Sequence, residues 1–301
     1  MAWKRIAGYR HCRLSVVSMM RLDEKLNAAS GVYFEGTLIY SLQTPHQLIE
    51  VFDTPELGKL MRIDGANMLS ERDEFFYHEN LIHPAAIAHP RPTRVLIIGG
   101  GDGGSAEEML KHPSVENVVL AELDRGVIEM ARKHFQFVHR GALDDARLKI
   151  HIGDGMAYLR EAGLRWDLVY LDLTDPIGEA AALYTEVFYA DCRHALNEGG
   201  AMVLHIGSPF SHAARVRESV RQLRAVFRQV AAYFVHIPAY GAVWGFAVAS
   251  NSLDPQLLNT QQVDARLAER NILHRQFYNG AMHQAMFALP EYIRKILNDI
   301  W

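Results

Sequence analysis

The sequence has few cysteines, no long apolar run and no strong excess of one charge. Cys12 and Cys192 are the only cysteines in 301 residues, too few and too far apart to suggest a disulfide framework or a zinc site. No apolar run approaches the roughly 20 residues that cross a bilayer. A net charge of −4, with 22% charged residues, gives no basic surface for nucleic acid. We therefore expect a cytoplasmic protein without a membrane or nucleic-acid partner.

The first part of the chain predicts a small β domain. Residues 1–24 are expected to form a loosely ordered extension, because they begin with a basic stretch that has neither a long apolar segment nor a small-residue cleavage site. Short β-type runs alternate with turn signals between Tyr33 and Leu69, which predicts an antiparallel sheet in a domain spanning 25–84. Ser70 and Asp73 have the spacing of a capping box, so we expect a helix over about 71–82, stopped by His83-Pro84.

The remainder, 85–301, predicts a larger α/β domain. Runs that are apolar on both faces alternate with helical segments, which is typical of a parallel sheet covered by helices on each side. The two later runs AAYFVHIP and VWGFAVAS are expected to complete the sheet, antiparallel at its edge, and a short helix is expected at 291–297. The five expected parallel strands are 95–99, 118–122, 148–153, 168–172 and 201–205.

The segment VLIIGGGDGG (95–104) is a buried strand that ends in a glycine loop. Gly99 and Gly101 allow the backbone to come very close to a ligand at the carboxyl end of the strand, where the next helix also offers its amides. Asp102 lies inside this loop. Its carboxylate would repel a pyrophosphate and favour a sulfonium or an ammonium.

Further acidic residues are expected at the same edge of the sheet. Glu122 follows Asp102 by twenty residues, a spacing at which an acid accepts hydrogen bonds from both hydroxyls of a ribose. Asp154 suits the amino group of an adenine, although the same residue could simply cap a helix. The glycine loop and Glu122 fit either NAD or S-adenosylmethionine as the ligand. Asp102 makes NAD the much less favoured of the two.

Two carboxylates lie close together in LDLTDPIG (171–178). A diamine or polyamine would bind between Asp172 and Asp175, and a carboxylate there could take a proton from it. That step matters because an ammonium, with a pKa near ~10, is no nucleophile until it is deprotonated. For Asp175 alone, a turn with a helix cap is the competing interpretation.

Seven blocks, in the same order, make the chain resemble the polyamine aminopropyltransferase (spermidine synthase) family. The resemblance implies a Rossmann-like methyltransferase-type domain with a small N-terminal antiparallel β domain, assembled as a homodimer or homotetramer. It also implies transfer of an aminopropyl group from decarboxylated S-adenosylmethionine, a co-substrate, to an amine, leaving 5′-methylthioadenosine, with no metal and no cofactor. The blocks are ERDEFFYHE (71–79), VLIIGGGDGG (95–104), VVLAELD (118–124), IGDG (152–155), DLTDPIG (172–178), IPAYG (237–241) and YNGAMHQAMFALPEY (278–292).

The resemblance also assigns roles to individual residues. Asp172 matches the catalytic acid, which orients and deprotonates the amine, and Asp102 would hold the ammonium of the aminopropyl arm and reject the carboxylate of ordinary S-adenosylmethionine. On the donor side, Gln47 and Glu122 match ribose contacts, and Asp154 with Gly155 match adenine contacts. On the acceptor side, the matching positions are Tyr77, Asp175 and Tyr240, with Tyr33 closing the channel and His78 where bacterial relatives have histidine.

The chain departs from the family pattern around the acceptor. His205 stands where the family has a glutamine, a gate loop is changed at Glu179–Ala182, and the segment Gly241–Trp244 differs. Putrescine is the default acceptor, with cadaverine, agmatine and spermidine left open. A methyltransferase, a non-catalytic binder of nucleosides or polyamines, and an NAD-dependent enzyme are the alternative functions.

Overall fold

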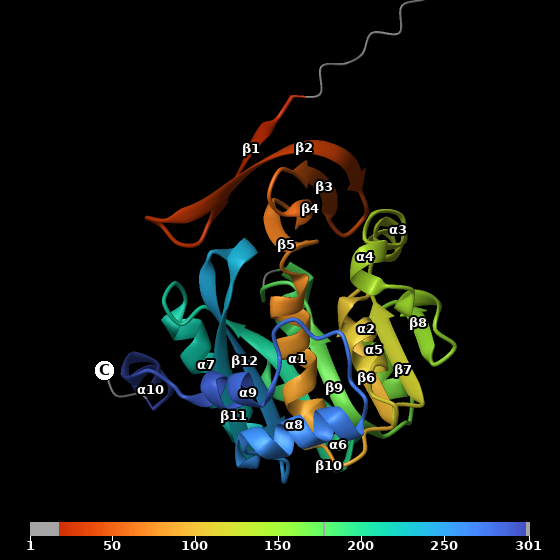
Figure 1. The fold of residues 1–301 in the computed structure, drawn as a ribbon, viewed down its shortest axis with the longest axis vertical. Helices are drawn as coiled ribbons and strands as arrows, with labels where there is room; N and C mark the ends of the chain where they lie inside the picture. The colour runs from red at the N-terminus through yellow and green to blue at the C-terminus, as the bar shows by residue number, and fades with distance from the viewer. Residues whose placement is uncertain (1–17, 177, 299–301) are drawn as a thin grey trace, which may run out of the picture.

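The computed structural model describes residues 18–176 and 178–298, which form two sheets (Figure 1). The first is antiparallel, in the order β1-β2-β3-β4-β5, and lies at the top of Figure 1. It confirms the small N-terminal β domain. Its strands are β1 Met20–Lys25, β2 Gly31–Gln43, β3 Leu48–Thr54, β4 Gly58–Ile63 and β5 Ala66–Ser70.

The second sheet has seven strands in the order β11-β12-β10-β9-β6-β7-β8. Neighbours from β10 to β8 are parallel, whereas β12 is antiparallel to both β10 and β11. The predicted Rossmann-like α/β fold and its antiparallel edge are thereby confirmed. The strands are β6 Arg94–Gly99, β7 Asn117–Glu122, β8 Leu148–Ile152, β9 Trp166–Asp172, β10 Leu196–Gly207, β11 Gln229–Ile237 and β12 Ala242–Ser250.

Helices cover both faces of the larger sheet and bury two apolar clusters against it. On one face lie α1 Glu74–Ala88, α2 Gly104–Leu110, α8 Thr260–Glu269 and α9 Gly280–Phe287. On the other lie α5 Gly155–Glu161, α6 Glu186–Ala195, α7 Ala213–Val226 and α10 Glu291–Leu297. Two helices, α3 Arg125–His134 and α4 Gln136–His139, pack against the small sheet. None of the described helices is long and apolar enough to cross a membrane.

Helix α1 differs from the expected helix at both ends. Ser70 does not cap it: its hydroxyl donates to Asp73 Oδ1 over 2.6 Å, and no side chain caps the first turn. The helix also continues through Pro84, which was expected to stop it. Pro84 has no backbone N–H, so the carbonyl of Asn80, one turn earlier, loses its usual helical donor. This carbonyl instead accepts a hydrogen bond from the Tyr233 hydroxyl at 2.7 Å. Tertiary packing thus replaces the missing helical bond.

The expected domain boundaries fall inside secondary structure. The boundary after residue 24 cuts β1, which pairs with β2 along its whole length. The boundary after residue 84 cuts α1. Residues 1–17 of the expected extension, with Cys12, lie outside the described residues, whereas Cys192 is buried.

Candidate active site

A cavity of about 1040 Å³ lies where the small sheet meets the carboxyl ends of the parallel strands. Its walls come from β1, β5, α1, the glycine loop, the ends of β7 and β9, and the start of α7. Residues from remote parts of the chain therefore meet there, as the acidic strand ends predicted. The predicted residues on its walls are Gln47, Tyr77, His78, Gly99, Gly101, Asp102, Glu122, Asp154, Gly155, Asp172, Asp175, His205 and Tyr240.

Tyr33, expected to close the acceptor channel, does not line this cavity. Its side chain is 54% exposed on β2. The Arg21 guanidinium lies 3.8 Å from the centre of its ring, a cation–π contact at the outer ribbon of the small sheet. Within this chain Tyr33 thus lies on the outer ribbon and not on the cavity wall, and its role in closing the channel stays a prediction.

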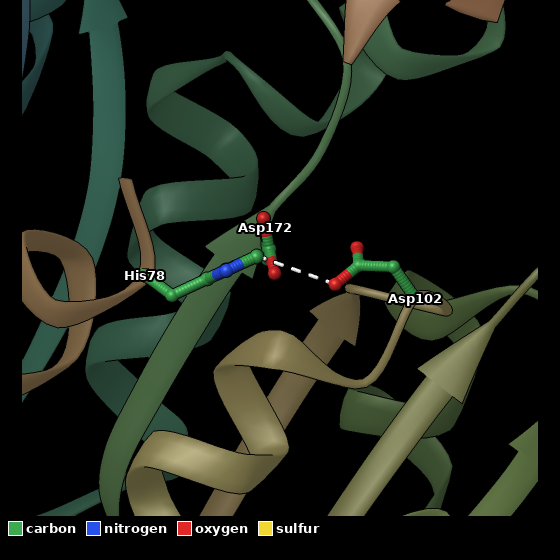
Figure 2. A group of neighbouring side chains, drawn as sticks. All are labelled: His78, Asp102 and Asp172. Atoms are coloured by element: carbon green, nitrogen blue, oxygen red, sulfur yellow. Dashed lines mark ion pairs between the residues drawn. The ribbon is translucent and has the colours of Figure 1, made fainter. Parts of the chain in front are cut away.

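Asp102, His78 and Glu74 form a line of alternating charge (Figure 2 shows the first two). The imidazole Nε2 lies 3.2 Å from Asp102 Oδ1, and Nδ1 lies 2.8 Å from Glu74 Oε2. Burial would lower the pKa of His78, but Asp102 and then Glu74 raise it well above its usual value. Burial alone would raise the pKa of Asp102, yet His78 and the Gly104 amide outweigh it and lower it. Asp102 is thus kept as a carboxylate beside an imidazolium.

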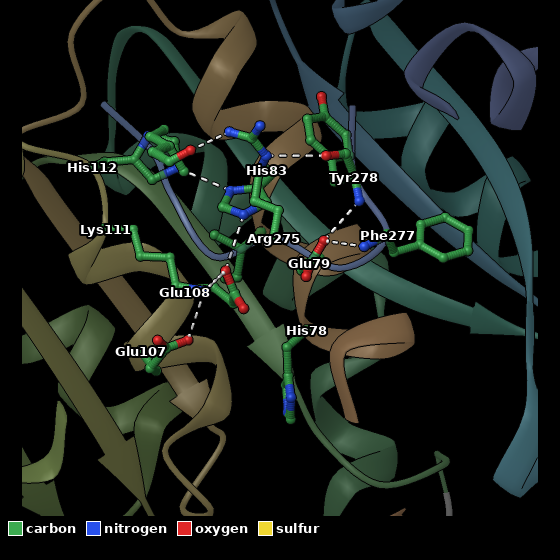
Figure 3. Close-up of polar contacts among 12 residues, drawn as sticks. His78, Glu79, His83, Glu107, Glu108, Lys111, His112, Arg275, Phe277 and Tyr278 are labelled. Atoms are coloured by element: carbon green, nitrogen blue, oxygen red, sulfur yellow. Dashed lines mark hydrogen bonds and ion pairs between the residues drawn. The ribbon is translucent and has the colours of Figure 1, made fainter. Parts of the chain in front are cut away.

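The position of this imidazolium is set by α2 and by buried ion pairs below it. A side chain at Gly104 would start 2.2 Å from the His78 ring, so only glycine leaves room for it. Arg140 then links Glu74, at 3.3 Å, to Glu107 on α2, at 3.2 Å. Deeper in the same interface, α1 and α2 are joined by His83, Glu108 and Lys111 (Figure 3). These contacts hold His78 and the Asp102 loop in a fixed relation.

Asp172 ends β9 beside this pair, and among the described residues no cation is paired with its carboxylate alone. Its backbone carbonyl accepts a hydrogen bond from the Gly100 amide at 2.8 Å, which anchors the strand end to the glycine loop. Within the described residues, its Oδ2 has no hydrogen-bond partner. Burial, then the charge of Asp102, raise the pKa of Asp172 to about 6, although His78 and the hydroxyls of Ser105 and Tyr77 oppose the rise. A carboxylate of this kind is suited to accept a proton near neutral pH.

His78, Asp102 and Asp172 offer three possible metal-ligand atoms within 4.8 Å of one another. Both ring nitrogens of His78, however, already face carboxylates, and the raised pKa keeps both of them protonated. A protonated ring nitrogen has no lone pair for a metal. The cluster therefore suits an organic cation better than a metal ion, and the expected lack of a metal remains a prediction.

The donor side of the cavity is organised around Glu122 at the end of β7. Its Oε2 accepts from the Gly101 amide at 3.1 Å and its Oε1 from the Asp124 amide at 2.9 Å. Burial raises the pKa of Glu122 to about 7, although these two hydrogen bonds oppose the rise. Gln47 reaches the same place from the small sheet and donates to Asp124 Oδ2 at 3.0 Å. Asp154 caps α5 by accepting from the Met156 amide at 2.8 Å, so the helix-cap interpretation is confirmed, and a ligand contact would come in addition.

The acceptor side is lined by aromatic rings. Tyr77 lies between His78 and Tyr240, with its ring centre 6.2 Å from that of Tyr240. The Tyr77 hydroxyl is buried and close enough to Asp172 to lower the pKa of that carboxyl. His205 stacks on Trp244 at 5.8 Å, and its Nε2 lies 2.9 Å from the Leu173 carbonyl. The same Nε2 lies 2.7 Å from the Tyr184 hydroxyl, and burial lowers the pKa of His205 and keeps its ring neutral.

Sequence reasoning missed two charged residues on this side. Glu24 was assigned to the N-terminal extension, but it lies on β1, lines the cavity and accepts from the Asn67 amide at 2.8 Å. Arg215, on α7, forms an ion pair with Asp175 at 2.8 Å. Asp175 is therefore not the free carboxylate that the sequence predicted. No local pattern marks either residue, because each reaches the cavity only through tertiary packing.

Comparison with known proteins identifies relatives of the whole chain. The model of the spermine/spermidine synthase domain matches residues 74–260. A polyamine aminopropyltransferase from Nitrosomonas europaea is 44% identical over 277 residues, covering 92% of this chain and 85% of its own length. One from a Thermoanaerobacter species is 38% identical, covering 92% of this chain and 97% of its own length.

Two solved structures share the fold. A spermidine synthase in complex with the transition-state analogue AdoDATO superposes with a TM-score of 0.87 at 34% identity, covering 98% of both chains. The spermidine synthase from Thermotoga maritima superposes with a TM-score of 0.85 at 36% identity, covering 93% of this chain and 94% of its own. The likeness thus includes the small sheet as well as the larger one.

Proposed function

This chain belongs to the spermine/spermidine synthase family and is an aminopropyltransferase of polyamine biosynthesis, and we propose that it transfers the aminopropyl group of decarboxylated S-adenosylmethionine to a diamine. Putrescine is the default acceptor, and spermidine and 5′-methylthioadenosine are the products. The observation that carries the proposal is the pairing of Asp102, kept charged by His78, with Asp172, whose Oδ2 is unpartnered among the described residues.

The donor fits the acidic side of the cavity. Asp102 makes its contacts with His78 and Gly104 through Oδ1, so Oδ2 can receive the ammonium of the aminopropyl arm. Ordinary S-adenosylmethionine carries a further carboxylate, which would meet the charge of Asp102 and be repelled. Glu122 and Gln47 supply acceptors and donors for the ribose hydroxyls, and Asp154 with Gly155 borders the adenine.

The chemistry requires one proton transfer and one displacement. The acceptor binds as an ammonium, and Asp172 takes a proton from it, directly or through a water molecule. The freed amine then attacks the carbon next to the sulfonium. A new C–N bond forms, the C–S bond breaks, and its electron pair goes to sulfur, which leaves as neutral methylthioadenosine. Positioning and one general base suffice for this step, so the proposal includes neither a metal nor a cofactor.

The acceptor would lie between Asp172 and the aromatic wall. The rings of Tyr77 and Tyr240 can flank a methylene chain and face its ammonium groups. Neutral His205 takes the place of the family's glutamine. The gate would be formed by the short 3₁₀ helix η2 at Gly178–Leu183, of which the Glu179 side chain lies outside the described part. Cadaverine, agmatine and spermidine are the other acceptors to be tested.

Assembly as a homodimer or homotetramer, and a cytoplasmic location, also belong to this proposal. Support for assembly comes from the outer ribbon of the small sheet, where large apolar side chains are exposed to solvent. Large apolar side chains exposed to solvent suit contact with another subunit. They are Met19, Met20, Leu38 and Ile39.

A product assay tests the function. The protein is incubated with decarboxylated S-adenosylmethionine and each of the four amines, and the products are read by mass spectrometry. We expect methylthioadenosine together with an amine heavier by one aminopropyl group. Methylated product from intact S-adenosylmethionine, or no methylthioadenosine with any amine, would contradict the proposal. Stronger thermal stabilisation by intact S-adenosylmethionine than by its decarboxylated form would likewise favour a methyltransferase.

A further inference from the structure

Arg215 places a positive charge on the wall of a cavity that is proposed to bind cations. Its guanidinium Nη1 lies 2.8 Å from Asp175 Oδ1, and both side chains are partly accessible, at 22% and 31%. Both residues line the cavity. Asp175 follows Asp172 by three residues, so the pair lies at the acceptor end. One of the two carboxylates expected to bind the acceptor is therefore already neutralised.

The backbone is shaped to seat this guanidinium. Residues His205 and Gly207 flank an irregularity where β10 shifts its register against β12. Gly207 has φ of +87°, a conformation that favours glycine, and a Cβ there would lie 3.3 Å from Arg215 Nε. Any larger residue at 207 would crowd the guanidinium. The bare glycine thus provides a flat surface for Arg215 directly after the His205 position that departs from the family.

The charge of Arg215 also acts on its neighbours. Burial, followed by a smaller effect of the Arg215 charge, lowers the pKa of His205 and of His212, so both rings on this wall stay neutral and Arg215 is the cation that pairs with Asp175. Glu24 lines the same cavity as Asp175, and its pKa is raised, mainly by burial and to a smaller extent by the charge of Asp175. Lys25, next to Glu24, also lines the cavity. An ammonium entering here meets Asp175 only in competition with Arg215.

We propose that Arg215 sets the acceptor selectivity of this enzyme by occupying Asp175 and thereby disfavouring amines with more than two positive charges. The inference rests on the proposed function. A diamine uses one ammonium at Asp172 and has one distal charge to place. A triamine brings an additional ammonium into the space next to Arg215, where like charges repel and Asp175 is already shared with the guanidinium. The same wall would tolerate a diamine whose distal ammonium lies towards Glu24.

The test compares acceptors in variants of Arg215. R215Q and R215M remove the charge, and R215K keeps it. R221Q is the matched control, because Arg221 lies on the same helix but pairs with Glu218 on the exposed surface. Putrescine and spermidine are compared as acceptors by methylthioadenosine release. We expect R215Q and R215M to raise the ratio of kcat/KM for spermidine over putrescine about tenfold or more, mainly through KM, by removal of the repulsion. R215K and R221Q should leave the ratio within about twofold of the unchanged protein.

The failure of this inference is distinguishable from failure of the function. If the unchanged protein forms no methylthioadenosine with any amine, the proposed function fails and the inference with it. If the unchanged protein is active but folded R215Q and R215M keep its acceptor ratio, the inference alone is overturned. If melting curves show that both variants are unfolded, the D175N variant is measured instead. It leaves Arg215 without its partner carboxylate and should lower the ratio of kcat/KM for spermidine over putrescine further. An unchanged ratio in D175N overturns the inference.

Discussion

Replacement of Asp172 by Asn tests the central chemical step. The substitution keeps the shape of the side chain and removes the group that takes the proton from the acceptor amine. A positioned general base contributes about 10²–10⁴ in rate, which is about 3–5.5 kcal/mol of activation free energy. We therefore expect kcat to fall by that factor in D172N. The affinity for the donor should largely survive, because Asp102 and Glu122 are untouched.

The same substitution should stabilise the fold. The native pKa of Asp172 is raised from 3.8 to about 6, mainly by burial. A carboxyl whose pKa is raised in the folded state binds its proton more tightly there than in the unfolded chain. Below pH 4 the carboxyl is protonated in both states, so its burial then costs no folding stability. The cost grows as pH rises from 4 to 6 and is complete above 6. It amounts to about 3 kcal/mol at neutral pH. D172N should therefore melt at a higher temperature than the unchanged protein at pH 7, with little difference at pH 4.

Three measurements decide the outcome. Methylthioadenosine release gives kcat, calorimetry gives donor affinity, and thermal melting at pH 4 and pH 7 gives stability. D144N is a matched control, because Asp144 is an exposed aspartate that pairs with Arg132 away from the cavity. The unchanged protein should also lose kcat as pH falls through about 6, and a flat profile from about pH 5 to 8 would count against a titrating base. Undiminished turnover in D172N would refute the assigned role.

Three further substitutions test the donor site and the scaffold. D102N should weaken binding of the decarboxylated donor about tenfold or more and reduce discrimination against ordinary S-adenosylmethionine; equal preference in both proteins, measured by calorimetry, would refute the charge argument. E122Q should raise the donor KM about tenfold with kcat nearly unchanged. In the unchanged protein, donor affinity should decline from pH 8 to pH 6, because the pKa of Glu122 is about 7; pH-independent affinity would exclude this. E79Q should lower the free energy of unfolding by about 2–4 kcal/mol in denaturant titrations. The reason is that Glu79 is fully buried and accepts hydrogen bonds from three backbone amides, those of residues 276–278 (Figure 3). An unchanged denaturation midpoint would show that these bonds are dispensable.

The strands and their shared edge were predictable from the sequence because their signal is local. Runs such as 95–99 and 168–172 are apolar on both faces, and this pattern arises when helices cover both sides of a sheet. Glycine and acidic residues directly after such runs indicate the ligand edge. For this reason Asp102, Glu122 and Asp172 could be placed on one cavity without any knowledge of the three-dimensional structure.

The errors come from partners that are distant in sequence. Pro84 looks like a helix stop until the Tyr233 hydroxyl, from β11, is seen to replace the lost bond. Glu24 looks like part of a tail until β1 pairs with β2. Asp175 looks like a free carboxylate until Arg215 approaches it from α7. In each case the decisive group is a single side chain or strand whose location depends on the finished tertiary structure.

The two acids at the centre of the site have opposite electrostatic surroundings, and this difference divides their tasks. Asp102 is balanced by His78, which in turn is held by Glu74, so the pKa of Asp102 stays low and its charge is permanent. Asp172 is buried, has no ion pair of its own among the described residues and also feels the charge of Asp102, so its pKa rises to about 6. A carboxylate with a low pKa is a weak base and suits holding a cation, whereas one with a raised pKa suits accepting a proton. Loss of His78 should therefore raise the pKa of Asp102, and the two carboxyls would then titrate as a coupled pair in which a proton on one lowers the proton affinity of the other.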